Sequence, residues 1–508
     1  MSQFRFSPRP NQAHEIPWNA WGPEAFAQAE REGKPILLSI SAVWCHWCHV
    51  MDETTYSDPG VIDAIRRQFV PIRVDNDERP DINARYNMGG WPTTAFLSAD
   101  GTTLAGATYV PPVQMQHILT EIAQWYHDNA AQVAQRGAEI RERRLAHQTA
   151  TRDDMRIEGV RDLVESIART YDEEYAGFGE APKFPQPELL EFLLNESEAT
   201  GEARLHEMVV RTLRAMAGGG MYDRVEGGFF RYSTTRDWSV PHFEKMAEDH
   251  AGLIRVISLV LRHSPQEELR ATLRSAVEYV TTVLRDPQTS TFAGSQDADE
   301  EYYALSLEER RRRRAPCVDR TLYSDRNAAL AGAFCLAGAA LEDDAVVANG
   351  VETLDTVHER MLDADGLLVH VHREGDRPVC GLIGDQAAYL RASIEAHDVT
   401  NEDRFLDRAA ALADTLERRL GAPDGGFYDR APEQEHLGRL ALQDKPIAEN
   451  AIVAESLVRL SELLDEERYR QLAERTLSIY AKTFVHAGAF AAPYARALRR
   501  FLSSVAHC

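Results

Sequence analysis

The sequence predicts two structural classes in one chain, an α/β domain at the N-terminus and a larger all-α domain after it. Three observations predict this arrangement. An apolar strand pattern over residues 35–43 leads directly into a C-x-x-C motif at Cys45 and Cys48. Beyond about residue 150, long amphipathic stretches alternate with short turns rich in glycine and aromatic residues. The chain has 508 residues, which is too long for one ordinary domain.

The pattern around Cys45 and Cys48 is typical of the redox pair of a thioredoxin-like fold. At a strand-to-helix turn, Cys45 lies next to the free N–H groups of the first helical turn, whose partial positive charge favours a thiolate. Cys48, one turn further on, can then resolve a mixed disulfide. His46 and His49 lie nearby and add to the expectation that Cys45 is the more acidic and more reactive thiol.

The same residues allow three other interpretations. The string CHWCH over 45–49 also matches the attachment pattern for c-type haem, but haem attachment normally requires export, and the first residues contain no apolar signal core. Zinc could bind to the two cysteines with His46 or His49, but no second Cys/His pair lies at zinc-ribbon spacing. The third alternative is a structural cysteine pair without a redox function.

The residues that follow extend the thioredoxin-like pattern. The spacing predicts a helix over 61–69, a strand over 70–74 and a turn with a helix start over 75–81. Pro92 then opens a predicted strand, and the Asp100-Gly101 turn leads into a last strand that ends near Tyr109. A proline cannot serve a central ladder, but a cis-proline at the start of a strand can expose backbone for substrate pairing. We therefore expect the Trp91-Pro92 bond to be cis.

These residues resemble the thioredoxin domain of the spermatogenesis-associated thioredoxin-like family over positions 17–112. The resemblance implies that Cys45 is the nucleophile, Cys48 the resolving thiol and Pro92 the cis-proline. We also expect Trp44 and Trp91, which flank these residues in the sequence, to contact a substrate. One position departs from ordinary thioredoxins, which carry a buried aspartate six residues before the first cysteine; here that residue is Ser39. The matching positions are Trp18, Trp21 and Gly22, residues 33–36, 45–51, 75–81 and 89–92, Tyr109 and Pro111.

Composition excludes several classes of protein. Six cysteines in 508 residues do not form a disulfide scaffold, and Cys317, Cys335, Cys380 and Cys508 are scattered as small apolar residues or idle thiols. This pattern fits a reducing cytoplasm. The longest apolar run, 332–341, is far too short for a membrane span and predicts a core helix. We expect no cofactor, no metal and no membrane partner.

The net charge of -24 argues against nucleic acid as a partner, because a phosphate backbone would be repelled. The basic run 310–314 follows Glu308 and Glu309, so it predicts a solvated helix end or an internal ion-pair region. Excess acid with scarce lysine is typical of proteins from salt-loving archaea, and a GC-rich genome would also replace lysine with arginine. The sequence does not separate these two origins.

Composition also places the domain boundaries. A helical pattern rich in Ala, Gln, Glu and Arg covers 113–148, and the polar stretch 149–154 interrupts it. We expect a thioredoxin-like domain over 1–130, a helical linker over 131–155 and a helical domain over 156–508.

Turns of similar composition recur through the helical domain about every 50 to 75 residues, near residues 177, 227, 292, 366 and 425. This is the length of a helix pair with its connections, and such a period indicates a repeat architecture. About 350 residues accommodate about six hairpins at about 60 residues each. We predict an α/α toroid with an inner and an outer ring of helices, and the alternative is a straight helical solenoid.

Four segments of this domain are similar to the second domain of the same family: 179–185, 219–223, 227–233 and 238–246. Such domains resemble six-hairpin glycosidases and the sugar 2-epimerases. The resemblance implies the fold and does not transfer a substrate.

Polar residues gather at the predicted turns of the helical domain and form its candidate site. Paired carboxylates are what glycoside hydrolysis requires, whereas an epimerase needs a base beside a carbonyl, for which His242 is the candidate. We expect one cavity to be lined by catalytic His242, Glu244, Asp297, Asp385 and Glu449, with Tyr222, Arg231, Trp238 and Lys245 as substrate contacts. The simpler alternative is that these groups cap helices and bind one another.

His370 and His372 alternate on a short predicted strand, where metal ligands could share one side, but a solvent-facing pair is the expected arrangement. The leading hypothesis is a cytoplasmic thiol-disulfide oxidoreductase that acts on a protein disulfide or a small thiol. The second hypothesis is a sugar isomerase or glycoside hydrolase that the redox pair regulates, with a sugar in the toroid. The third is a scaffold in which both domains only bind a partner.

Overall fold

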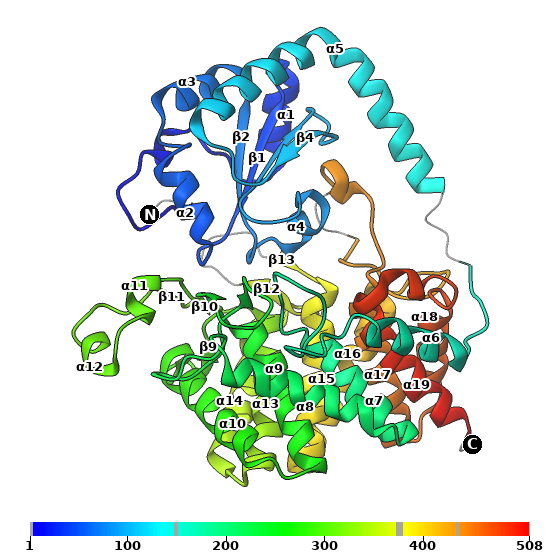
Figure 1. Ribbon diagram of the computed structural model, residues 1–508. Helices are drawn as coiled ribbons and strands as arrows, with labels where there is room; N and C mark the ends of the chain where they lie inside the picture. The colour runs from blue at the N-terminus through cyan, green and yellow to red at the C-terminus, as the bar shows by residue number, and fades with distance from the viewer. Residues whose placement is uncertain (1–3, 147–150, 372–378, 433–435, 507–508) are drawn as a thin grey trace. The chain divides into compact units, whose positions relative to one another are not determined.

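The computed structural model describes residues 4–146, 151–371, 379–432 and 436–506, and the chain divides into two compact units. The first unit contains residues 1–149 together with 433–444, and the second contains 150–432 and 445–508. The first unit is α/β and the second is helical, as the sequence predicts (Figure 1).

A four-stranded sheet in the order β2-β1-β3-β4 forms the centre of the first unit. Its strands are β1 (Ile36–Ser41), β2 (Val70–Asp75), β3 (Thr93–Leu97) and β4 (Thr103–Ala107). β1 pairs in parallel with β2, whereas β3 is antiparallel to both β1 and β4. Strands β1 and β3 are buried at every position, so both faces of the sheet must be covered by helices.

Helices cover the two faces of this sheet with separate hydrophobic cores. One core joins the sheet to α2 (His46–Glu53), α3 (Pro59–Gln68) and α5 (Pro112–Ala146) through residues such as Leu37, Met51 and Leu119. The other joins it to α1 (Pro23–Glu32) and α4 (Pro80–Tyr86) through residues such as Phe26, Leu38 and Ile82. The element order β1-α2-α3-β2-α4-β3-β4-α5 is the predicted thioredoxin-like arrangement.

Residues 436–444 also pack with the first unit, although almost 300 residues separate them from its other elements. Leu440 is fully buried in the core with Trp21, and Arg439 N–H donates to the Tyr86 hydroxyl at 2.7 Å. Gly101 is required at the closest approach, because a Cβ there would lie 2.4 Å from the Cα of Gly438. The sequence pattern gave no indication of this packing.

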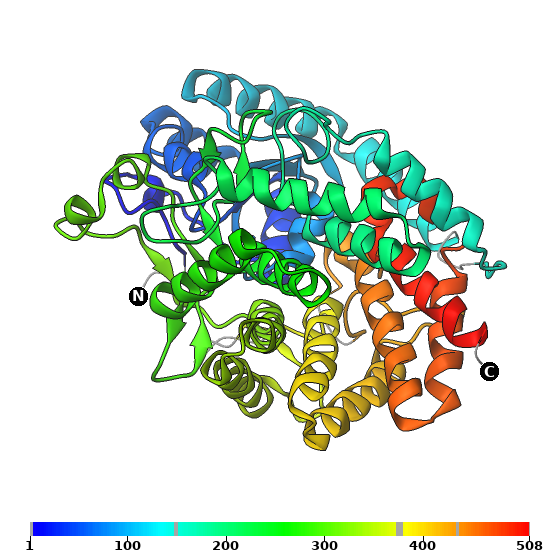
Figure 2. The ribbon, with the colours of Figure 1, turned by 60° about the horizontal axis from the view of Figure 1, so that its bottom comes forward.

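The described residues of the second unit form a closed double ring of six helix pairs, which confirms the α/α toroid (Figure 2). Each inner helix packs against the next around the ring, and α19 packs against α7 to close it, so the unit is not a solenoid. The inner helices are α7 (Pro187–Thr200), α9 (Ala247–His263), α13 (Ser324–Leu341), α15 (Ile383–Thr400), α17 (Ile447–Leu464) and α19 (Ala492–Ala506). Their outer partners are α6 (Ile157–Ala168), α8 (Ala203–Gly218), α10 (Glu267–Tyr279), α14 (Asp344–Met361), α16 (Asp403–Arg419) and α18 (Glu467–Ser478).

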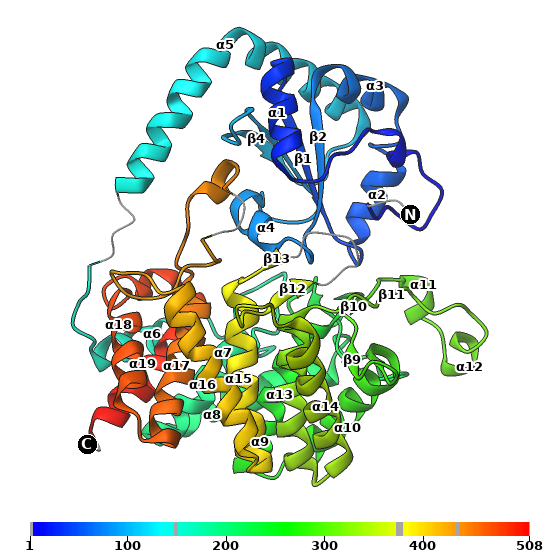
Figure 3. The same cartoon turned by 180° about the vertical axis from the view of Figure 1, so that it is seen from behind.

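Because inner and outer helices alternate along the chain, the first turns of all the inner helices lie at the same end of the ring. Short strands and two short helices occupy the connections at this end (Figure 3). They are β5 (Tyr232–Ser233), β6 (Pro241–His242), β7 (Lys245–Met246), β8 (Arg285–Asp286), β9 (Thr291–Phe292), β10 (Ser295–Gln296), β11 (Val318–Asp319), β12 (Val369–Val371), β13 (Val379–Cys380), α11 (Glu300–Tyr303) and α12 (Leu307–Arg310).

The recurring turns are held by one repeated hydrogen bond. The fourth residue of each of four inner helices accepts the backbone N–H of the turn that precedes it. The pairs are His250 Nε2 with Phe229 at 2.9 Å, Asn327 Oδ1 with Phe292 at 2.7 Å, Gln386 Oε1 with Leu368 at 2.9 Å and Asn450 Oδ1 with Phe427 at 2.7 Å. All four side chains are fully buried, so each satisfies a backbone group that would otherwise be costly to bury. The sequence period therefore has a physical cause.

A network of ion pairs spans the middle of the inner ring. Arg391 on α15 pairs with Glu191 on α7, which is the helix opposite it in the ring. Arg496 on α19 also reaches Glu191 at 2.9 Å, and Arg255 on α9 reaches Glu395 on α15 at 2.8 Å. Burial opposes ionisation, but the surrounding guanidinium groups outweigh it and lower the pKa of Glu191 to about 2. Charged side chains thus cross-link opposite walls of the ring at mid-depth.

None of the helices within the described part of the chain is both long and apolar enough to cross a membrane.

Candidate functional sites

Cys45 and Cys48 form a disulfide at the start of α2. Cys45 is the N-cap of the helix, and its Sγ accepts a hydrogen bond from the backbone N–H of Cys48 at 3.1 Å. This is the geometry that the sequence predicts, because a sulfur at the N-cap faces the unpaired N–H groups of the first turn. Both cysteines are almost fully buried, at 4% and 2% exposure.

The Trp91-Pro92 bond is cis, as predicted. Pro92 immediately precedes Thr93, which pairs with Ile40 near the end of β1, the strand that leads to Cys45. The ring of Trp91 packs edge-on against that of Trp44 at 5.6 Å, and Trp44 is buried, with its Nε1 donating to Asp77 at 2.7 Å. Trp44 therefore fixes the loop before Cys45, and its contact with a substrate stays a prediction.

Trp47 is the aromatic residue of the motif that faces solvent, and we did not identify it from the sequence. It is 47% exposed between the two cysteines and packs against Tyr109 at 5.2 Å. An exposed indole beside a disulfide offers apolar contact area to an approaching substrate. The signal was present in the sequence, because Trp47 is the one tryptophan that the motif places inside the first helical turn.

Ser39, which replaces the usual aspartate, is fully buried in β1 and lies opposite Arg73 of β2. Arg73 forms a bidentate, buried ion pair with Asp52, with both N···O distances at 2.9 Å. Asp52 follows Cys48 by one turn of α2 and so lies on the same helix face. A buried carboxylate is thus present near the cysteines, but it comes from α2 and is tied to an arginine.

His49 differs from the sequence expectation. Burial lowers the pKa of His49, and the nearby Asp52 carboxylate only partly offsets that effect. A neutral imidazole contributes little positive charge to a thiolate, so the helix N-terminus carries most of the expected stabilisation of Cys45.

Carboxyl groups occupy the third position of three inner helices: Asp249 on α9, Asp385 on α15 and Glu449 on α17. Burial raises the pKa of all three carboxyl groups. The pKa of Asp249 rises to about 8, because the negative charge of Glu248 adds to the effect of burial. A carboxyl group that holds its proton near neutral pH can act as a general acid. The predicted residues Asp385 and Glu449 are thus brought to the same end of the ring.

A second group of predicted residues surrounds His242. His242 Nδ1 bonds to Glu244, and its ring stacks on Tyr232 at 4.9 Å. Arg231 N–H donates to the Glu244 carbonyl at 2.9 Å. β10 pairs with β7 in the register that sets Gln296 opposite Lys245, and Asp297 is the first residue after β10. The structure therefore brings His242 and Glu244 together, and the role of His242, Glu244 and Asp297 in catalysis stays a prediction.

Other predicted substrate contacts have structural partners inside the unit. Lys245 Nζ is fully buried, bonds to Asp223 and to the Gly227 carbonyl at 2.8 Å each, and lies over the ring of Tyr279 at 4.3 Å. Trp238 is 1% exposed and donates to the Tyr175 carbonyl at 3.1 Å. Tyr222 packs its ring against Phe229 at 4.9 Å, so these three side chains hold turns in place.

Arg310, from the basic run, is also internal. Its Nη1 bonds to Asp223 at 2.6 Å and to Glu226 at 2.9 Å, which selects the internal ion-pair alternative for this residue. The next four arginines of the run are exposed.

The expectation of a solvent-facing histidine pair on 370–372 is wrong for His370. This side chain is 1% exposed and its Nδ1 bonds to Asp385 Oδ1 at 2.8 Å, because β12 runs between the starts of two inner helices. His372 lies outside the described residues. Cys335 is buried and Cys317 is exposed, in line with scattered thiols, and Cys508 also lies outside the described residues.

Comparisons with known proteins agree with this two-part structure. The family model Thioredox_DsbH, described as a protein of unknown function, DUF255, matches residues 8–145. The chain is 34% identical over 307 residues to spermatogenesis-associated protein 20 of Homo sapiens, covering 56% of this chain and 39% of that protein. It thus spans about two fifths of the length of this curated relative.

Two further similarities concern one unit each. Over 81 residues, 15% of this chain and 14% of the relative, the chain is 28% identical to the thiol:disulfide interchange protein DsbD of Pseudomonas fluorescens. The structure of cellobiose 2-epimerase from Spirochaeta thermophila superposes with a TM-score of 0.54 at 13% identity, covering 69% of this chain and 96% of that one. At this identity the likeness shows the fold alone. The resemblance drawn from the sequence is confirmed: a thioredoxin-like domain with a Cys45–Cys48 disulfide is joined to an epimerase-like α/α toroid.

Proposed function

We propose that the first unit catalyses thiol-disulfide exchange through Cys45 and Cys48. The observation that carries this proposal is the Cys45–Cys48 disulfide at the N-terminus of α2, with Cys45 Sγ accepting the N–H of Cys48. Similarity to a thiol:disulfide interchange protein supports it. The protein disulfide or small thiol on which it acts, and the reducing cytoplasm that would keep the pair available, belong to the proposal.

The exchange proceeds in two balanced steps. The Cys45 thiolate of the reduced protein attacks one sulfur of a substrate disulfide, forming a mixed disulfide and releasing the other substrate sulfur as a thiolate. The Cys48 thiolate then attacks Cys45 Sγ, forming the Cys45–Cys48 bond and releasing the second substrate thiolate. Two electrons pass from the cysteine pair to the substrate, and the same steps in reverse oxidise a dithiol.

The test begins with the fully reduced protein. Iodoacetamide at neutral pH should label Cys45 before Cys48, and Cys48→Ser should accumulate a mixed disulfide when oxidised glutathione is added. Peptide mass spectrometry locates both adducts. If Cys48 labels first, or if oxidised glutathione never restores the Cys45–Cys48 bond, the exchange proposal fails.

We further propose that the toroid binds a sugar at the end where the inner helices begin. Buried carboxyl groups with raised pKa values, Asp385 and Glu449, support an acid role, and His242 with Glu244 supports a base role. With Asp297 they form the catalytic set of this second proposal. It ranks below the first because lysine and aromatic side chains that we expected to contact a substrate have internal partners.

Two measurements separate epimerisation from hydrolysis. A panel of monosaccharides and disaccharides is first screened for an increase in the melting temperature of the protein. The sugars that bind are then incubated in D2O: incorporation of deuterium at C2 indicates epimerisation, and new reducing ends indicate hydrolysis. If no sugar raises the melting temperature, the toroid is a scaffold and this second proposal is abandoned.

A further inference from the structure

Three elements of the toroid converge around His370. The strand β12 that carries it is attached to the start of α13, where Ser324 Oγ donates to the Val369 carbonyl at 2.6 Å. It is attached to the start of α15 as well, since Leu368 N–H donates to Gln386 Oε1 at 2.9 Å. His370 is therefore held between the first turns of two neighbouring inner helices. These first turns carry Asp325 and Asp385.

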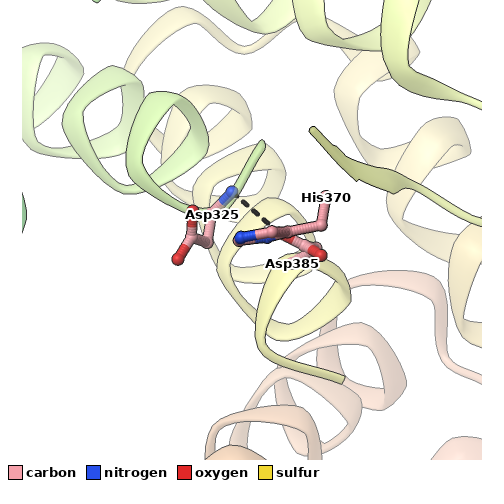
Figure 4. A group of neighbouring side chains, drawn as sticks. All are labelled: Asp325, His370 and Asp385. Carbon is pink, nitrogen blue, oxygen red and sulfur yellow. Dashed lines mark hydrogen bonds and ion pairs between the residues drawn. The ribbon is translucent and has the colours of Figure 1, made fainter. Parts of the chain in front are cut away.

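The donor atoms of Asp325, His370 and Asp385 lie close together. One ligand atom from each residue lies within 4.8 Å of the others, which is the spacing that a single bound ion requires (Figure 4). His370 Nδ1 is 2.8 Å from Asp385 Oδ1, and Asp325 N–H donates to the same oxygen at 3.1 Å. His370 and Asp385 are each 1% exposed, whereas Asp325 is half-buried on the open side of the group.

A second observation points to a ligand. The other oxygen of the buried Asp385 carboxylate, Oδ2, has no hydrogen-bond partner. Burying an acceptor without a partner is costly, so such a group needs a compensating interaction. The oxygen belongs to the same carboxylate whose Oδ1 contacts His370 and Asp325.

We propose that Asp325, His370 and Asp385 bind a divalent cation. Two carboxylates and one imidazole suit Mn²⁺, Zn²⁺ or Fe²⁺ and differ from the all-oxygen sets that Ca²⁺ and Mg²⁺ prefer. The ion takes the place of the proton between His370 Nδ1 and Asp385 Oδ1. Its positive charge neutralises the two aspartate carboxylates. Three protein ligands leave further coordination positions for water or for hydroxyl and carbonyl oxygens of a ligand on the side of Asp325.

This inference is independent of the exchange chemistry of Cys45 and Cys48. It assigns Asp385 to the cation in place of an acid role, which leaves Glu449 as the acid of the sugar proposal. The repeated architecture shows why the site is local to α13 and α15. The corresponding third position carries Asp249 on α9 and Glu449 on α17, but only at α15 does a strand histidine meet the carboxylate among the described residues.

The test uses Mn²⁺ with the full-length, oxidised protein, because manganese does not compete for the soft sulfur ligands of thiols. Isothermal titration and the loss of the free Mn²⁺ electron paramagnetic resonance signal should give one site per chain. His370→Gln and Asp385→Asn should each weaken binding at least about tenfold, since even residues that only support metal ligands contribute that much. Asp325→Asn should do the same, and as a half-buried residue at a helix start it tolerates substitution.

His263→Gln is the matched control. His263 also pairs with a carboxylate, Glu198 at 2.8 Å, but it lies at the C-terminal end of α9. It should bind Mn²⁺ with wild-type affinity, and circular dichroism verifies that each variant is folded. A repeat with Zn²⁺ uses the Cys45→Ser/Cys48→Ser background. If neither metal binds, or if the Asp325→Asn and His370→Gln proteins bind as the wild type does, His370 and Asp385 form a structural ion pair and the proposal is overturned.

Discussion

The disulfide site is assembled in the opposite way to the mouth of the toroid, which is the end of the ring where the inner helices begin. In the first unit the reactive groups lie within one turn of α2, and the cis-proline follows on the neighbouring strand. In the second unit Asp249, Asp385 and Glu449 come from three helices and about 200 residues of sequence. Local sequence therefore suffices to recognise the first site. The second site exists only because a closed ring returns the starts of its inner helices to one end.

The two sites also differ in whether lysine or arginine neutralises their buried carboxylates. Near the disulfide, Asp52 is neutralised by a bidentate arginine. At the end of the toroid where the inner helices begin, burial leaves Asp385 and Glu449 with raised pKa values, while the Asp223 and Glu191 carboxylates are paired with cations. Buried carboxyl groups with raised pKa values lie where function is proposed, and carboxylates paired with lysine or arginine hold the fold.

The largest effect is expected when Cys45, the nucleophile of the disulfide site, is replaced. Cys45→Ser should reduce disulfide exchange by at least about 1,000-fold, because it removes the attacking thiolate and the described residues of the first unit contain no cysteine besides Cys45 and Cys48. Exchange with oxidised glutathione measures the effect. Metal and sugar binding by the toroid should remain at wild-type levels, and a parallel loss there would show that the two sites are not independent.

The next effect concerns the paired carboxylates. Burial would raise the pKa of Asp223, but the Lys245 ammonium and the Arg310 guanidinium outweigh it and hold the pKa below its usual range. Asp223→Asn leaves two buried cations without their shared anion, and we expect a loss of about 3 to 5 kcal/mol in the free energy of unfolding. Urea unfolding followed by circular dichroism measures it.

Asp172→Asn is the matched variant in the corresponding turn. There Lys183 is fully buried, but the second partner, Arg236, is 47% exposed and can be hydrated when the carboxylate is lost. We expect a smaller loss than for Asp223→Asn. Equal losses would mean that the number of buried cations does not determine the cost.

A buried carboxyl group with a raised pKa should make the folded protein less stable as the pH rises. Since the pKa of Asp249 is about 8 in the folded protein and about 4 in the unfolded chain, the group destabilises the fold increasingly from pH 4 to pH 8. Asp249→Asn removes this penalty, so its melting temperature should exceed that of the wild type by about 2 °C or more at pH 8. At pH 4 the two melting temperatures should coincide.

Asp162→Asn, at an exposed position of α6, is the control and should show no such pH dependence. A stabilisation by Asp249→Asn that is equal at pH 4 and pH 8 would contradict the raised pKa.

The smallest effect is expected at Trp47, the exposed tryptophan between the two cysteines. Trp47→Ala should raise KM for a protein disulfide by about fivefold, because an exposed indole is lost from the contact surface. Its free energy of unfolding should change by less than about 0.5 kcal/mol. Trp125→Ala, a similarly exposed tryptophan on α5, is the control and should leave KM unchanged. If both variants behave alike, Trp47 is not a substrate contact.

Much of the architecture could be predicted because it depends on local patterns. The apolar run before Cys45 gave β1, the proline before Thr93 gave β3, and the recurring turns gave six helix pairs. Four of these turns share a sequence signature because each needs a buried side chain, such as Asn327 or Asn450, for its backbone N–H. A requirement repeated at four of the helix pairs leaves a period that can be counted.

What the sequence by itself determined is thus the redox pair, the cis-proline and the class of both units. Only the tertiary structure decided which polar residues are free to act. The sequence pattern predicted substrate contacts at Lys245 and Trp238, but both side chains bind partners inside the unit. It predicted a surface position for His370, which instead contacts Asp385 in a buried cluster. The physical reason is that burial and pairing depend on neighbours far along the chain. The same residue type is therefore structural or reactive according to contacts that no local pattern records.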